Sequence, residues 1–185
     1  MQSLFFGDSA LKMSPVEARG VDPQQTWLLK QSYAVLHGIE KDASTGVFVG
    51  MQGASGGGPN DARPGYSGTA RALCIASGRI SYTLGLTGPC ITLDTACSAS
   101  LVAVHLASAD LQRAVCSRAL AFGVEFLSSH VTQSFSAAGM LSAVGRCHTF
   151  DATADGYCRG EGCVVLMLES MSQSMYCAVV GSAVQ

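Results

Sequence analysis

One cysteine in this chain lies where a strand-like run meets a helix-like run, a position suited to covalent chemistry. Residues 91–96 are β-branched or apolar apart from Asp94, which is typical of a strand, and Cys97 follows directly. Residues 101–107 are rich in leucine, valine and alanine, which predicts a buried helix. We therefore expect Cys97 at a strand-to-helix turn. Unpaired N–H groups and the positive end of the helix dipole there favour a thiolate and a developing oxyanion.

The elements that would position Cys97 are short apolar strands alternating with helices. This alternation predicts an α/β fold with a largely parallel sheet covered by helices. Glycine and proline in residues 50–68 predict a loop. Beyond 91–96, strands are expected at 45–50, 118–124, 162–169 and 178–184. Helices are expected at about 24–37, at about 69–84, from Cys97 to about 113, and near 131–138.

Composition excludes several classes of protein. The chain has 185 residues, 48% hydrophobic and only 13% charged, which indicates one domain with a substantial core. Its formal net charge of −2, with no basic run, argues against nucleic acid or a membrane surface as a partner. No apolar segment reaches the roughly 18 residues that span a bilayer, and the N-terminus lacks a secretory signal pattern. We expect a cytoplasmic or organellar protein, a plastid being possible, that is not secreted.

The eight cysteines include no CxxC pair, which argues against a common zinc motif. A zinc site built from Cys147, His148, Cys158 and Cys163 is an alternative, but the spacing fits no usual ligand pattern. We therefore predict no metal site. The seven cysteines other than Cys97 are expected to be packing residues.

A series of motifs gives the chain a resemblance to a known family. They occur in the order found in β-ketoacyl synthases, and the chain most resembles the ketosynthase domains of type I modular polyketide synthases, in the thiolase-like superfamily. The string around Cys97 is the most specific of them. The motifs are DPQQ at 22–25, GRISY at 78–82, GP at 88–89, DTACSAS at 94–100, GRC at 145–147, ADGY at 154–157 and GEG at 160–162.

The resemblance implies a thiolase-like α/β fold and an acyltransferase, a 3-oxoacyl synthase of polyketide or fatty-acid type. In the family, the cysteine matched by Cys97 takes an acyl group from the phosphopantetheine of an acyl carrier protein, and a backbone N–H contributes to the oxyanion hole. A malonyl-type thioester is then decarboxylated and attacks the acyl-cysteine in a Claisen condensation. The resemblance implies no metal or other cofactor in the domain. It implies two partners, the carrier protein and a second copy in a homodimer.

The resemblance covers only the N-terminal half of the family's domain. The family's first strand, of the type I-A-I-V-G, is missing, and so are the H-G-T-G-T and N-x-G-H strings that carry its two catalytic histidines. The second half begins at about residue 177. We therefore expect residues 1–185 to form an incomplete β-ketoacyl synthase domain. Alone, it would be acylated slowly at most and would not condense.

The four histidines are not expected to replace the family's pair. His105, eight residues after Cys97 on the same predicted helix, is expected to be a packed or hydrogen-bonded core residue. His37 near a helix end and His130 in a loop are expected to be solvated. His148 is expected in a loop near the rim of the site. The pattern therefore predicts no Cys–His pair.

Four other charged residues are expected to be structural. Asp94 is expected to be buried and paired by backbone donors or a hydroxyl. Glu161, between two glycines, is expected to hold a loop by hydrogen bonds. Arg79 and Arg146 are expected to form ion pairs or anchor loops.

Two other functions remain open at this point. A thiolase, or a relative of ketosynthase III or chalcone synthase, would share the strand–cysteine–helix arrangement, but without DPQQ and DTACSxS together. A truncated, non-catalytic protein that binds a partner ketosynthase or a carrier protein would belong to a different class altogether.

Overall fold

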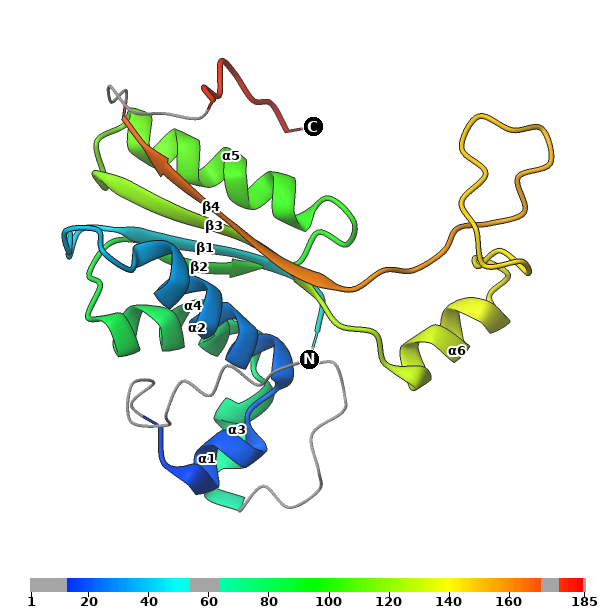
Figure 1. The fold of residues 1–185 in the computed structure, drawn as a ribbon, viewed down its shortest axis with the longest axis horizontal. Coiled ribbons are helices and arrows are strands. Elements are labelled where there is room, and N and C mark those ends of the chain that lie inside the picture. Colours follow the sequence, from blue (N-terminus) through cyan, green and yellow to red (C-terminus); the bar gives the residue numbers. More distant parts are fainter. Residues whose placement is uncertain (1–12, 54–63, 171–176, 185) are drawn as a thin grey trace.

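A four-stranded sheet with helices on both faces forms the centre of the computed structural model, which describes residues 13–53, 64–170 and 177–184 (Figure 1). The strands lie in the order β2-β1-β3-β4. The first three are mutually parallel, and β4 is antiparallel to β3. The predicted α/β fold with a largely parallel sheet is confirmed. The strands are β1 (Gly46–Met51), β2 (Cys90–Leu93), β3 (Arg118–Glu125) and β4 (Gly162–Glu169).

Six helices are present in the described part of the chain. One face of the sheet is covered by α5, and the other by α2 and α4 (Figure 1). Within the described residues, no helix is both long and apolar enough to cross a membrane. The helices are α1 (Pro15–Gly20), α2 (Pro23–Leu36), α3 (Pro64–Arg71), α4 (Leu73–Leu84), α5 (Ala99–Gln112) and α6 (Ser129–Ala137).

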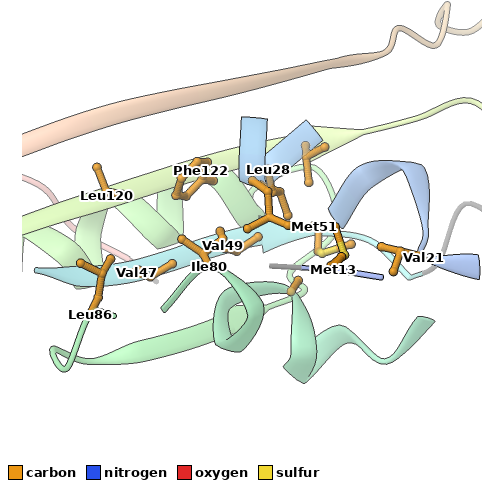
Figure 2. Packing of buried hydrophobic residues seen from close by; sticks show 13 residues of the cluster. Met13, Val21, Leu28, Val47, Val49, Met51, Ile80, Leu86, Leu120 and Phe122 are labelled. Carbon is orange, nitrogen blue, oxygen red and sulfur yellow. The ribbon is translucent and has the colours of Figure 1, made fainter. Parts of the chain in front are cut away.

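The central strand β1 is buried on both faces, as its continuous apolar run predicts. Val47 and Val49 point toward α2 and α4, where they meet Leu28 and Ile80 (Figure 2). Phe48 points to the opposite face and packs with alanines of α5. This alternation gives the molecule two hydrophobic clusters, one on each side of the sheet.

The helix expected at 69–84 is instead two helices, α3 and α4, separated at Ala72, whose backbone is extended. The break is held by bonds from a distant segment. The Asp22 N–H donates to the Ala70 carbonyl at 3.0 Å, and the Gln25 amide donates to the Ala72 carbonyl at 3.4 Å. The loop expected at 50–68 is also wrong in part, because α3 begins at Pro64. Residues 54–63 lie outside the described residues.

The short helix predicted near 131–138 is confirmed as α6, but the strand expected at 178–184 is not formed. Residues 177–184 have no regular structure and are exposed, and Val180 is 99% exposed. A strand is stable only when a neighbour takes its backbone hydrogen bonds, and no described strand lies beside this segment. Its apolar composition therefore does not produce a strand.

Candidate active site

Cys97 lies in the turn between β2 and α5, as the sequence predicts, and its thiol is free and exposed. Ala96, directly before it, has a φ of 53°, in the left-handed region that residues with a side chain rarely adopt. The Ala96 N–H donates to the Asp94 carboxylate at 2.9 Å, which holds this tight turn. Backbone strain of this kind often accompanies functional sites.

The N-terminus of α5 carries no side-chain cap. The Ser98 hydroxyl instead donates back to the carbonyl and hydroxyl oxygens of Thr95, at 2.8 and 2.9 Å. By contrast, Asp22 caps α2 and Ser128 caps α6. The N–H groups of Ser98 and Ala99 donate to the carbonyls of Thr95 and Ala96, at 3.3 and 3.1 Å. The rest of the first turn of α5 has no capping side chain, so this helix end can stabilise negative charge beside Cys97.

Two glycines that sequence reasoning missed bring α5 close to the sheet. A Cβ at Gly50, in β1, would lie 2.4 Å from the Ala99 carbonyl carbon. A Cβ at Gly123, in β3, would lie 2.7 Å from the Ser100 Cβ. Only glycine permits this approach, which seats the first turn of α5 over the ends of two strands. The signal in the sequence is a glycine that interrupts an otherwise apolar strand.

A cavity of about 900 Å³ opens beside Cys97. Its lining is mostly apolar and is contributed by β1, the turn before α5, α5, β3, α6, residues 157–160 and β4. The lining includes Leu101 and Val104 of α5, Phe135 of α6, and Val164 and Leu166 of β4. Leu101, Val164 and Leu166 are 72%, 64% and 50% exposed, so the cavity is open to solvent and offers its apolar walls to an extended apolar ligand.

A charged pair that the sequence analysis did not identify also lines the cavity. Arg159 donates to the Glu125 carboxylate, and the Arg159 side chain is only 8% exposed. Burial raises the pKa of Glu125, and the positive charge of Arg159 opposes this rise. The sequence signal is an arginine immediately before the GEG motif.

No histidine lines this cavity in the described part of the chain. His105 is hydrogen-bonded, as expected, with 2.9 Å between its Nδ1 and the Ser182 Oγ, but it is only partly buried and is therefore not the expected core residue. His37 is the C-cap residue of α2, as predicted. His130 lies in the first turn of α6 rather than in a loop, because the capping serine before it starts a helix there. His148 lies in a loop and is partly buried.

Of the four charged residues expected to be structural, Asp94 accepts a hydrogen bond from a backbone donor, the Ala96 N–H, as expected, but it is exposed rather than buried. Glu161 accepts a hydrogen bond from the Leu127 N–H at 3.2 Å, which confirms its loop-holding role. Arg79 forms the expected ion pair, with Glu17 at 2.6 Å. Arg146 is exposed, and its role as an anchor stays a prediction.

The expectation that seven cysteines serve as packing residues is largely wrong. Cys116 is buried, and Cys163 is partly buried, where desolvation raises its thiol pKa to about 11. The other five are exposed because they lie on outer helix or strand faces or in loops: Cys74, Cys90, Cys147, Cys158 and Cys177. Among the described residues, no group of three or more metal-ligating side chains is arranged to hold a metal ion, so the zinc alternative has no support there.

Comparison with known proteins decides the family. The model of the β-ketoacyl synthase N-terminal domain matches residues 3–174. This chain belongs to the β-ketoacyl synthase family. An erythronolide synthase of Saccharopolyspora erythraea is 42% identical over 181 residues, and a non-reducing polyketide synthase of Aspergillus fumigatus is 42% identical over 188. These matches cover 92% and 94% of this chain, but only 5% and 10% of the relatives.

Solved ketosynthase structures have the same fold. The ketosynthase from module 6 of the bacillaene synthase of Bacillus subtilis matches with a TM-score of 0.73 and 34% identity, over 87% of this chain and 29% of that one. An oxazolomycin ketosynthase domain of Streptomyces albus matches with a TM-score of 0.71 and 34% identity, over 86% of this chain and 30% of that one. The thiolase-like fold and the resemblance to polyketide ketosynthases, both predicted from the motifs, are confirmed.

Proposed function

We propose that this chain forms the nucleophile-bearing part of a polyketide ketosynthase, and that Cys97 accepts the acyl group. The observation that carries the proposal is an exposed thiol at an uncapped helix N-terminus, facing an apolar cavity of about 900 Å³. A thiolate and an oxyanion both gain from that helix end, and the cavity suits the hydrocarbon part of an acyl thioester.

The acyl transfer would follow from this geometry. The Cys97 thiol loses its proton, and its sulfur attacks the thioester carbonyl. The oxygen becomes negative and is stabilised by the backbone amides at the start of α5. Collapse of this intermediate breaks the original carbon–sulfur bond. The carrier's phosphopantetheine thiolate leaves and takes up a proton, while the acyl group stays on Cys97.

Condensation would use this acyl-cysteine. A malonyl-type thioester loses carbon dioxide, its carbanion attacks the acyl carbonyl, and the Cys97 thiolate is released. Because no histidine lines the cavity in the described part of the chain, we infer that the chain alone accepts acyl groups slowly and does not condense them. The acyl carrier protein and a second ketosynthase copy are the proposed partners, since the relatives include modular polyketide synthases.

Intact-mass and peptide mass spectrometry of the purified chain with octanoyl-pantetheine test the acylation. We expect one octanoyl adduct, on Cys97, that is absent from Cys97→Ala. Cys74→Ala is the matched control, because Cys74 is also exposed but lies on α4, away from the cavity, and the adduct should persist there.

An adduct that survives in Cys97→Ala would refute the assignment. No adduct at all would favour a non-catalytic, ketosynthase-like binding protein. Adding malonyl-pantetheine should give no elongated product, and an elongated product would contradict the inferred inability to condense.

A further inference from the structure

We propose that Arg159 is a positioning residue that fixes α6 against the end of β3, and so sets how well long acyl chains fit beside Cys97. The inference deepens the proposed function and rests on it for the identity of the ligand. Arg159 itself would not touch the reacting atoms. It would act through Phe135, which lines the same cavity as Cys97.

Arg159 contacts both α6 and the sheet. One terminal nitrogen donates to the Glu125 carboxylate at the end of β3. The other donates to the Thr132 hydroxyl in α6 at 3.0 Å. Its guanidinium carbon lies 5.0 Å from the centre of the Phe135 ring, within the range of a cation–π contact. Three contacts from one side chain therefore join two separate elements.

Few other contacts hold α6. None of its described residues is buried, and it projects from the sheet toward one side of the molecule (Figure 1). A helix without a buried face gains little from hydrophobic packing, so its few polar contacts decide its position. The nearby bond from the Leu127 N–H to Glu161 restrains the segment before α6, but not the helix itself.

The arrangement depends on an arginine in particular. A guanidinium presents several donors in a rigid plane, and its flat face stacks on an aromatic ring. A lysine could keep the charge next to Glu125, but one ammonium cannot reproduce both the hydrogen bond to Thr132 and the cation–π contact with Phe135. Replacing Arg159 with lysine should therefore loosen α6 while the charge is kept.

Loosening α6 would affect long ligands more than short ones. A methyl group stays beside the sulfur, whereas an octyl chain must extend along the cavity, whose lining includes Phe135. The readout is therefore a ratio of rates for long and short ligands, which a general loss of stability would not change in the same way.

The experiment alkylates the full chain with N-methyl and N-octyl iodoacetamide and follows Cys97 by peptide mass spectrometry. The Cys97 sulfur displaces iodide and the thiol proton goes to solvent, so no other part of the ketosynthase reaction is needed. We expect Thr132→Val and Arg159→Lys each to lower the octyl-to-methyl rate ratio about tenfold. Thr132 does not line the cavity, and valine has nearly its shape, so this variant removes only the bond to Arg159.

Arg118→Lys is the matched control, because Arg118 pairs with Glu169 at the other end of β3. Its rate ratio should equal that of the parent protein. Unchanged ratios in folded Thr132→Val and Arg159→Lys would overturn the proposal, and Thr132→Val decides alone if Arg159→Lys does not fold. A shifted ratio with no acylation by octanoyl-pantetheine would keep the role of Arg159 and reject the proposed acyl transfer.

Discussion

Each end of β3 carries one arginine–glutamate ion pair, but the two pairs lie in different surroundings. At the start of the strand, Arg118 pairs with Glu169, with 2.5 Å between nitrogen and oxygen. At its end, Glu125 pairs with Arg159. Both pairs join β3 to the chain at or near β4. Only the second lies beside a cavity and a candidate nucleophile.

At the amino end of β3, polar groups satisfy one another. The Asp42 carboxylate accepts bonds from the Ser44 N–H at 2.9 Å, from the Ser44 hydroxyl at 2.7 Å and from the Ser117 hydroxyl. These bonds tie two loops together. Groups that are paired in this way stabilise a fold but are not free to bind a ligand.

At the carboxyl end, the chain retains features that do not help stability. These are an uncapped helix, a left-handed alanine and a cavity beside an exposed thiol. The uncapped helix and the left-handed alanine belong to the turn between β2 and α5, which lies against the carboxyl end of β3 at Gly123. Among the described residues, the amino end also has one left-handed residue, Ala114, but no uncapped helix or candidate nucleophile, so local rules are broken more at the edge that carries Cys97, as is expected at a functional site. Variants matched between the two ends test this contrast.

The largest effects should come from two glycines in close backbone contact. A Cβ at Gly50 would lie 2.4 Å from the Ala99 carbonyl carbon, and one at Gly88 would lie 2.3 Å from the Ser44 carbonyl oxygen. We expect Gly50→Ala and Gly88→Ala each to lower the free energy of unfolding by about 3 kcal/mol. Only Gly50→Ala should also slow alkylation of Cys97, because it displaces the start of α5. Urea denaturation and iodoacetamide kinetics measure the two effects.

Gly78→Ala is the control for these glycine variants, because nothing lies within 4 Å of its added Cβ in α4. It should raise the free energy of unfolding by up to about 1 kcal/mol, since alanine favours a helix. If Gly50→Ala and Gly88→Ala slowed the alkylation of Cys97 equally, the reactivity of Cys97 would follow the general stability of the fold. The proposed difference between the two ends of β3 would then be wrong.

A smaller effect is expected at two alanines that flank α5. Ala96 has a φ of 53° and Ala114 a φ of 55°, so each holds a left-handed conformation that glycine adopts more easily. We expect Ala114→Gly to raise the free energy of unfolding by up to about 1 kcal/mol without changing the rate at which Cys97 is alkylated. Ala96→Gly should also be tolerated, but should slow Cys97 alkylation, because it relaxes the turn that presents the sulfur.

Thermal unfolding and the same alkylation assay check both alanine variants. A slower reaction in Ala114→Gly would show that changes anywhere along α5 reach Cys97. An unchanged rate in Ala96→Gly would show that the left-handed turn does not set the position of the thiol.

Prediction from the sequence succeeds for structural features that depend on residues close together in the chain. The apolar runs of β1, β3 and β4, and the turn at Cys97, follow from local periodicity and composition. The close approach of Gly50 to Ala99 could not be predicted, because it joins residues far apart in the chain. The break at Ala72 depends in the same way on Asp22 and Gln25.

Two failures of prediction from the sequence, the strand expected at 178–184 and the missed pairing of Arg159 with Glu125, have one cause. Both depend on contacts between residues far apart in the chain. Residues 178–184 have the composition of a strand, but a strand also needs a partner. The pairing of Arg159 with Glu125 was missed because the two residues belong to different motifs and meet only in the folded chain. Family motifs identified the cysteine, but not the residues that shape its cavity.

The smallest effect should be on the pH dependence of the free energy of unfolding. The contributions of Asp42, near the amino end of β3, and Glu125, at its carboxyl end, should change with pH in opposite directions. Bonds from Ser117 and then Ser44 lower the pKa of Asp42 from its ordinary 3.8. The folded state therefore binds this proton less tightly than the unfolded state, and the stability from Asp42 is lost as the pH falls below 3.8. Asp42→Asn should remove that acid-side loss.

Burial raises the pKa of Glu125 from its ordinary 4.5, so the folded state binds its proton more tightly than the unfolded state. The contribution of Glu125 is therefore greatest in acid and is lost as the pH rises from 4.5 through the raised pKa. Glu125→Gln should remove the loss of stability as the pH rises above 4.5, and should leave the loss of stability below pH 3.8 unchanged. Urea unfolding across the acid range measures both losses. If both variants removed the same loss, the two ends would be electrostatically alike, and their difference would rest on shape alone.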